Sequence, residues 1–129
     1  MKIIGIGVLL QTADGTYLFQ ERDHNTDRSP GQIAPFGGGL EDGEDVLVCA
    51  QRELWEELAL SPATTDLKTI GTFESHNQKG SRIQMFITKE VDKTSLELKE
   101  GKSIVELLLE DALNHPMVTT FTKEVLRAL

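Results

Sequence analysis

Three glutamates close an amphipathic stretch in the first half of this 129-residue chain, and they are the residues best suited to chemistry. Glu53, Glu56 and Glu57 are three and four residues apart, which places them in one narrow sector of a helix. Like charges at this spacing destabilise an isolated helix by roughly a few tenths of a kcal/mol per pair. Since hard cations such as Mg²⁺ take oxygen ligands, the cluster predicts either a metal site or a solvated acidic helix face.

The elements around the glutamates indicate how they are positioned. An apolar stripe with helical spacing runs beside them and predicts a helix seated on a sheet, formed by Leu47, Ala50, Leu54 and Leu58. Asp45 is the predicted N-cap, and Ser61-Pro62 is expected to stop the helix. The preceding glycines, Gly37 to Gly39, predict a turn that takes positive φ and brings backbone close to a ligand.

The spacing of the whole stretch narrows these alternatives. Five residues separate Gly38 from Glu44, and seven more lead to the run Arg-Glu-Leu-Trp-Glu-Glu-Leu-Ala-Leu at residues 52–60. This pattern resembles the signature of the Nudix hydrolases, the MutT-like pyrophosphohydrolases. One position departs, because the family has glycine where this chain has Ala59. Ala59 is therefore expected either to be strained in the left-handed region, at about 1 kcal/mol, or to mark a different helix end.

The resemblance implies an α/β (α+β) fold, the Nudix-type α/β/α sandwich with a mixed β-sheet between helices, in a single domain spanning residues 1–129. It also implies Mg²⁺-dependent hydrolysis of a pyrophosphate bond in a nucleoside diphosphate linked to a group X, with Mn²⁺ as a possible substitute. A (deoxy)nucleoside triphosphate is the favoured substrate. The alternatives are a catalytically silent Nudix-like module that binds a nucleotide or regulates, and an acidic interaction domain in which the spacing is accidental.

Residue roles follow from the same resemblance. The implied catalytic residues are Arg52, Glu53, Glu56 and Glu57, with Arg52 orienting a glutamate through a charge-assisted fork. The three glutamates would hold the metal together with further oxygen atoms, which the resemblance assigns to Glu44, to the carbonyl of Gly37 or Gly38, and to a later loop carboxylate, Glu100. A solvated loop glutamate is an equally good interpretation of Glu100.

Isolated basic and aromatic residues carry weaker signals. Phosphate contacts are predicted for Arg22, Arg28, Lys79 and Arg82, although each alone is also typical of a surface charge. The three histidines, His24, His76 and His115, lack mutual metal-ligand spacing and receive no role. Trp55 lies off the apolar stripe and is expected to be a partly covered packing residue. The MutT type reads oxidised guanine with an asparagine near its last helix. This chain has Val118-Thr119-Thr120 there, so we expect no strong preference for that base.

Composition limits the class of partner. The net charge of −8 argues against a nucleic-acid polymer, because basic patches are the usual footprint of such binding, whereas a small nucleotide remains compatible. No apolar run reaches the roughly 18 residues of a membrane helix, so no membrane association is expected. Cys49 is the only cysteine, which fits a reducing cytoplasm. We expect a cytoplasmic monomer or homodimer.

The remaining chain predicts strands, a polar loop and two short helical segments. The strands are expected at residues 3–11, 17–22, 67–74, 82–91 and 103–109, with a surface loop at residues 23–31. One helical turn is expected at residues 110–115, before Pro116. The last helix is expected to be capped by Thr119 or Thr120 and to bury one face containing Phe121, Val125 and Leu129.

Overall fold

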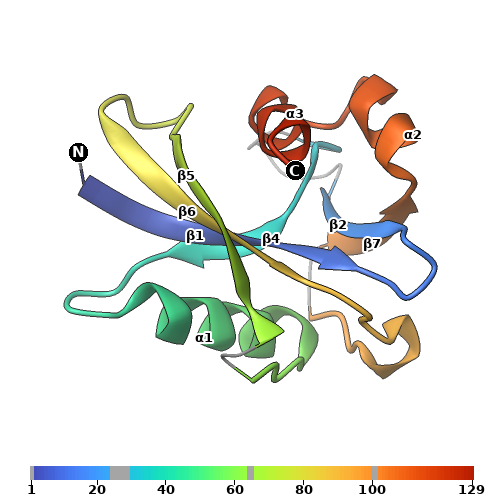
Figure 1. Cartoon of the computed structure of the whole chain (residues 1–129), viewed down its shortest axis with the longest axis horizontal. Helices are drawn as coiled ribbons and strands as arrows, with labels where there is room; N and C mark the ends of the chain where they lie inside the picture. Colours follow the sequence, from blue (N-terminus) through green and yellow to red (C-terminus); the bar gives the residue numbers. More distant parts are fainter. Residues whose placement is uncertain (1, 24–29, 64–65, 100–101) are drawn as a thin grey trace.

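The computed structural model describes residues 2–23, 30–63, 66–99 and 102–129. A mixed sheet lies between helix α1 on one face and helices α2 and α3 on the other (Figure 1), which confirms the predicted α/β/α sandwich. The elements in order are β1 Lys2–Gln11, β2 Tyr17–Arg22, β3 Ile33–Ala34, β4 Phe36–Gly39, α1 Val46–Leu58, β5 Lys68–Glu74, β6 Ser81–Thr88, η2 Lys93–Ser95, β7 Lys102–Leu107, α2 Leu109–Asn114 and α3 Thr120–Arg127.

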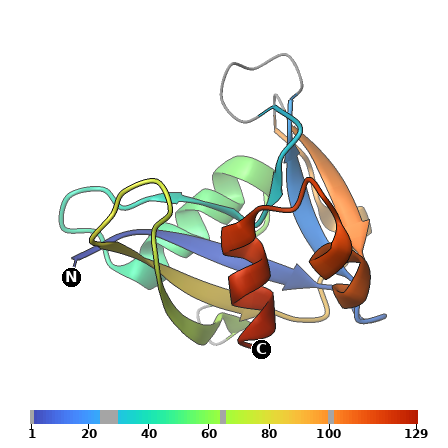
Figure 2. The same ribbon diagram turned by 90° about the horizontal axis from the view of Figure 1, so that it is seen from above.

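Strand β1 is the centre of the sheet. It runs parallel to β6 along most of its length and pairs antiparallel with β4 from Gly5 to Val8. Its pairing with β2 is limited to Leu10–Leu18 and Gln11–Tyr17, next to the hairpin turn. The strands β2, β3 and β7 therefore diverge from β1 and β4, and Figure 2 shows β2 and β7 at a steep angle to β1 and β6.

Alternate residues of the central strands face two separate cores, as the two-residue period of a strand requires. Val8 and Leu10 of β1 pack toward α1, with Leu54 and Leu58 of that helix fully buried. Leu9 packs on the other side against residues of β6 and α3, including Met85 and Val125. The apolar stripe predicted for α1 thus does seat the helix on the sheet.

The glycine-rich segment differs from the prediction. Residues 36–39 form strand β4, and among the described glycines positive φ occurs at other positions, such as Gly43 before α1. The glycines of β1 and β4 serve close backbone approach instead. A Cβ at Gly5 would lie 2.8 Å from the Gly38 carbonyl oxygen, and one at Gly37 would overlap the Ile6 carbonyl. Because these glycines have no side chain, β1 and β4 can lie close to each other.

Element ends also needed the tertiary structure. Strand β6 ends at Thr88 rather than at residue 91, and Glu90 follows in the left-handed region with φ 59°. Thr119 caps α3 by accepting a hydrogen bond from the Thr122 amide, as one of the two predicted caps. The prediction that Leu129 lies on the buried face is wrong, because α3 ends at Arg127 and Leu129 is 51% exposed. Trp55 is 55% exposed, so its coverage is partial as expected.

Helix α1 ends at Leu58, and Ala59 adopts φ 54° and ψ 30°. This is the left-handed conformation that the glycine of the family signature would take without strain. The Ala59 amide still donates to the Trp55 carbonyl at 2.9 Å, and the Leu60 amide donates to Leu54 at 3.3 Å. The helix end therefore keeps its regular hydrogen bonds despite the alanine, and of the two alternatives for Ala59 the strained, left-handed conformation is the correct one.

In the described part of the chain, no helix has the length and apolar character required to cross a bilayer.

Candidate active site

Arg52 is the centre of the polar cluster on α1. Its Nε and Nη2 atoms donate to the two carboxylate oxygens of Glu44 at 2.8 and 2.9 Å, which is a bidentate fork. Glu44 lies just before the helix, and Asp45 caps that helix by accepting from the Leu47 amide. The predicted fork between Arg52 and a glutamate is present, and it joins the loop before α1 to the middle of the helix.

The same guanidinium group contacts two of the three clustered glutamates. Its Nη1 lies 3.0 Å from Glu53 Oε1 and 3.3 Å from Glu56 Oε2, while Nη2 donates to the Gly39 carbonyl at 3.2 Å. The Glu53 side chain is only 13% exposed, whereas that of Glu56 is 54% exposed. Arg52 therefore holds a shielded carboxylate and a solvent-facing carboxylate next to each other, with strand β4 alongside.

The environment shifts the pKa values of these groups in opposite directions. Hydrogen bonding to Arg52 is the main reason that the pKa of Glu44 is lowered from 4.5 to about 2. Burial raises the pKa of Glu53, although Arg52 partly opposes the shift. The nearby Cys49 thiol has its pKa raised to about 12, mainly by burial, so it stays protonated and acts as a packing residue.

A divalent cation fits the chemistry of this donor set. Carboxylate oxygens are the ligands that Mg²⁺ prefers, and Glu53 and Glu56 share one guanidinium nitrogen. Within the described ranges, no three His, Cys, Asp or Glu side chains stand in metal-holding geometry. Arg52 neutralises part of the negative charge instead, and a cation would compete with it for Glu53 and Glu56. Glu57 is half-buried on the same helix.

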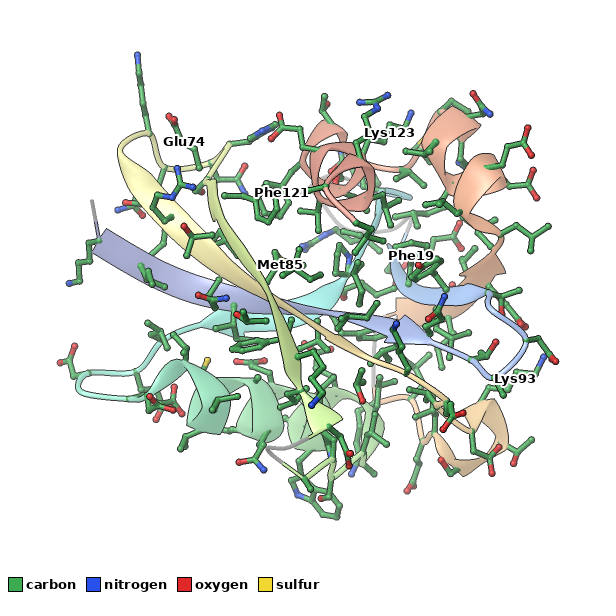
Figure 3. All side chains as sticks on the ribbon, in the orientation of Figure 1. Phe19, Glu74, Met85, Lys93, Phe121 and Lys123 are labelled. Atoms are coloured by element: carbon green, nitrogen blue, oxygen red, sulfur yellow. The ribbon has the colours of Figure 1, made fainter. Side chains whose placement is uncertain are left out.

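A pocket of about 470 Å³ lies where β2 and β3 diverge from β1 and β4. Its apolar wall includes Gly7, Met85 and Phe121, and Figure 3 shows Met85 and Phe121 between the sheet and α3. Gly37 also lines the pocket, while the next residue, Gly38, lies against the Glu53 carboxylate. Two consecutive residues of β4 thus connect the pocket with the glutamate cluster.

His76 contributes to the pocket, although sequence reasoning gave it no role. Its Nε2 lies 2.9 Å from Glu124 Oε1, and its ring meets Phe121 edge-on at a centroid distance of 5.6 Å. These contacts hold the loop between β5 and β6 against α3. A search for metal-ligand spacing could not find this residue, because its partners lie 45 and 48 residues away in the chain. The only indication in the sequence is that His76 and Asn77 are polar residues in a predicted turn between two strands.

The predicted substrate contacts fall in different places. Arg22 lines the pocket, as do Thr119 and Thr120 from the region that the sequence comparison with the MutT type had singled out. Arg82 instead donates through Nε to the Thr72 hydroxyl at 3.0 Å, and also to the Thr72 carbonyl. Lys79 is exposed in the turn before β6, and neither Arg82 nor Lys79 lines the pocket. Arg28 and Glu100 lie outside the described residues, as does His24.

Known proteins resemble this chain in sequence over part of its length and in fold over nearly all of it. An m7GpppN-mRNA hydrolase, NUDT17 from Bos taurus, is 40% identical over 57 residues, which cover 44% of this chain but only 19% of that protein. The chain thus matches about a fifth of the length of this relative. Among solved structures, the MutT NUDIX hydrolase from Burkholderia pseudomallei has a TM-score of 0.79 at 18% identity, over 100% of this chain and 98% of that chain. The MutT protein from Methanosarcina mazei Go1 has a TM-score of 0.78 at 20% identity, over 98% and 91%.

At these identities the solved structures show the fold alone, and the family assignment rests on the match to a family model. The family model of the NUDIX domain covers residues 1–129, and the signature spacing from Gly38 to Leu60 lies within it. The structure places that signature on one strand, one loop and one helix of the expected sandwich. The chain therefore belongs to the Nudix family.

Proposed function

We propose that this protein is a Nudix hydrolase that uses Mg²⁺ to cleave a pyrophosphate bond in a free nucleoside triphosphate. Nudix hydrolases act on small nucleotides, hydrolyse pyrophosphate linkages and generally use divalent metal ions. The observation that carries the proposal is the position of β4, whose residue Gly37 borders the pocket while Gly38 contacts Glu53. A nucleoside in the pocket would then extend its phosphates toward the carboxylates.

In the proposed mechanism Glu53, Glu56 and Glu57 would hold the metal, and one of these carboxylates would accept the proton of the attacking water. When bound, the cation would neutralise phosphate charge and lower the pKa of a water molecule. Arg52 positions Glu53 and Glu56 through its Nη1 atom, while the fork to Glu44 fixes the guanidinium itself. The carbonyls of Gly37 and Gly38, the Glu44 carboxylate and Glu100 stay predicted as additional oxygen ligands, and Mn²⁺ as a substitute metal.

Charge supports a small substrate. A chain with net charge −8 repels a polyanion unless positive charge is gathered locally, and Arg22 is an arginine that lines the pocket. NUDT17 is by its name an m7GpppN-mRNA hydrolase, but the match covers only 19% of that protein, and we propose the free nucleotide here. The region near the last helix, where the MutT type has its asparagine, reads Val118-Thr119-Thr120 here, so we propose no strong preference for oxidised guanine.

A substrate panel tests this proposal. Values of kcat/KM would be measured with Mg²⁺ for the common triphosphates, oxidised guanine triphosphate, ADP-ribose, a dinucleoside polyphosphate and a cap dinucleotide, with products identified. We expect an ordinary triphosphate to be among the best substrates. A thousandfold preference for any of the other four compounds would contradict the assignment. Nucleotide binding without turnover of any compound would favour the silent, regulatory alternative.

The organisation of the protein is part of the same proposal. We propose one domain over residues 1–129, acting in the cytoplasm as a monomer or homodimer without a nucleic-acid polymer or membrane as partner. The single cysteine is a free, buried thiol, which suits a reducing compartment. Light scattering after gel filtration would measure the mass in solution, and a mass above that of a dimer would contradict this assembly.

A further inference from the structure

The amide group of Gln20 has a chemically fixed orientation in the pocket. Gln20 lies on β2, lines the pocket and donates from Nε2 to the Pro35 carbonyl at 2.8 Å. A carbonyl oxygen can only accept a hydrogen bond, and proline has no backbone N–H that could donate one. The amide nitrogen of Gln20 must therefore face Pro35, and a flipped amide would set two oxygens against each other.

This orientation leaves the other end of the amide available. Among the described residues, the Oε1 atom of Gln20 has no hydrogen-bond partner. No buried side-chain oxygen or nitrogen in the described part of the molecule lacks a partner, so Oε1 is not buried. Since Gln20 lines the pocket, this acceptor is open to a ligand there.

The surroundings of Gln20 give the acceptor a selective role. Gly7, Ala34 and Met85 line the same pocket and offer apolar surface to a flat ring. The other amides of the pocket, Gln32 and Asn77, are exposed, and neither side chain is held by a hydrogen bond among the described residues. Those two amides can rotate to exchange their donor and acceptor ends, whereas the bond to Pro35 holds the Gln20 amide with its oxygen as the end turned away from Pro35.

We propose that Gln20 reads the nucleobase, and that its Oε1 accepts a hydrogen bond from an exocyclic amino group. This inference rests on the proposed function, because it assumes that the pocket takes the base of a nucleotide. An amino-bearing base satisfies the acceptor. A base with a keto oxygen at the same position places two acceptors together and leaves both without a donor. The enzyme is therefore a selector of amino-bearing over keto-bearing bases.

Matched nucleotide pairs test the selection. ATP and ITP carry an amino and a keto group, respectively, at the same purine position, and CTP and UTP do so at the same pyrimidine position. In each pair the adjacent ring nitrogen also changes from an acceptor to an N–H donor, so the Gln20 variants below are needed to assign the effect to Oε1. In whichever pair is cleaved faster, we expect kcat/KM to favour the amino member by about tenfold, as one hydrogen bond allows. A ratio near one in the wild type, or a preference for the keto member, would overturn the proposal.

Two variants separate base reading from a general loss of function. Gln20→Met removes the amide at similar length and should bring the ratio to about one, chiefly by slowing the amino member. Gln51→Met is the matched control, because Gln51 also donates its amide nitrogen to a proline carbonyl, that of Pro62, but lies outside the pocket. This control should keep the wild-type ratio. An unchanged ratio in Gln20→Met would count against the proposal, and Gln20→Asn, which is too short for both contacts, offers the same test if the methionine variant does not fold.

Binding without turnover distinguishes this inference from the proposed function. AMP and IMP would be titrated into the wild-type protein by calorimetry, which needs no hydrolysis. Tighter binding of AMP, lost in Gln20→Met, supports base reading even if triphosphates are not the substrates. Equal affinities, or no binding of either nucleotide, would overturn it, whereas a failure to hydrolyse triphosphates contradicts only the proposed reaction.

Discussion

The Glu53 carboxylate of α1 lies directly against the backbone of Gly38 in β4. A Cβ placed on Gly38 would overlap all three atoms of that carboxyl group, whereas a Cβ on the adjacent Gly39 would meet nothing closer than the Ile4 carbonyl oxygen at 3.8 Å. The glycine of the Nudix signature therefore determines how closely the glutamate-bearing helix approaches the strand.

We expect Gly38→Ala to displace Glu53 and to lower the free energy of unfolding by about 1–3 kcal/mol, the usual cost of overpacking. Activity should fall further than stability alone explains, because the displaced carboxylate is a proposed metal ligand. Gly39→Ala is the control and should leave both nearly unchanged. Urea unfolding would measure the free energy of unfolding, and kcat would measure the activity. Equal stability and equal kcat in Gly38→Ala and Gly39→Ala would show that the contact between Gly38 and Glu53 is unimportant.

If Glu53 binds Mg²⁺, the effect of Glu53→Gln on the melting temperature should depend on whether the metal is present. Burial raises the pKa of Glu53 in the folded state, so ionisation disfavours folding and stability falls as the pH rises through that pKa. Without divalent cations, Glu53→Gln should therefore melt at a higher temperature than wild type near pH 7. Mg²⁺ should stabilise the wild type by mass action and the variant much less.

The catalytic role of the three clustered glutamates is tested by replacing each of them with glutamine. Glu53→Gln, Glu56→Gln and Glu57→Gln should each reduce turnover by orders of magnitude while the circular dichroism spectrum stays native. Near-wild-type activity in all three variants would contradict the catalytic assignment. If Mg²⁺ raised the melting temperatures of the wild type and the variants equally, that result would contradict the metal site.

The Arg52–Glu44 fork predicts part of the acid sensitivity. The pKa of Glu44 is lowered from 4.5 to about 2, so the folded state favours the ionised carboxylate. This contribution to stability is complete above pH 4.5 and is lost as the pH falls toward 2. Glu44→Gln should be less stable than wild type at neutral pH, and the difference should shrink across that interval. Thermal melts between pH 2 and 7 would measure it, and a constant difference would refute the linkage.

The left-handed alanine predicts a stabilising substitution. Ala59 has φ 54°, and the left-handed conformation costs an L-residue roughly 1–2 kcal/mol, whereas glycine adopts it without this cost. Ala59→Gly should stabilise the protein by up to about 1 kcal/mol, because added freedom in the unfolded chain offsets part of the gain. Ala13→Gly, at an exposed turn position without positive φ, should be neutral or destabilising. Destabilisation at Ala59 would show that the helix end tolerates alanine without strain.

The sequence by itself determined the family, the sandwich fold and the helix that carries the glutamates. These follow from local information, because capping by Asp45, the apolar stripe and the spacing from Gly38 to Leu60 all act within a few turns of one helix. It also raised the question of Ala59, because an unusual residue at a helix end is visible in the chain itself.

Only the tertiary structure decided how that helix meets the rest of the molecule. The strand conformation of Gly37 to Gly39, the pairing of His76 with Glu124 and the orientation of Gln20 toward Pro35 each depend on segments that pack together only in the folded sheet. Arg82 looked like a phosphate contact in the sequence, but it is hydrogen-bonded to Thr72 across the strand pair β5–β6. The sequence shows which side chains are charged or carry an amide, whereas the partners that orient those side chains lie 10, 15 and 48 residues away in the chain.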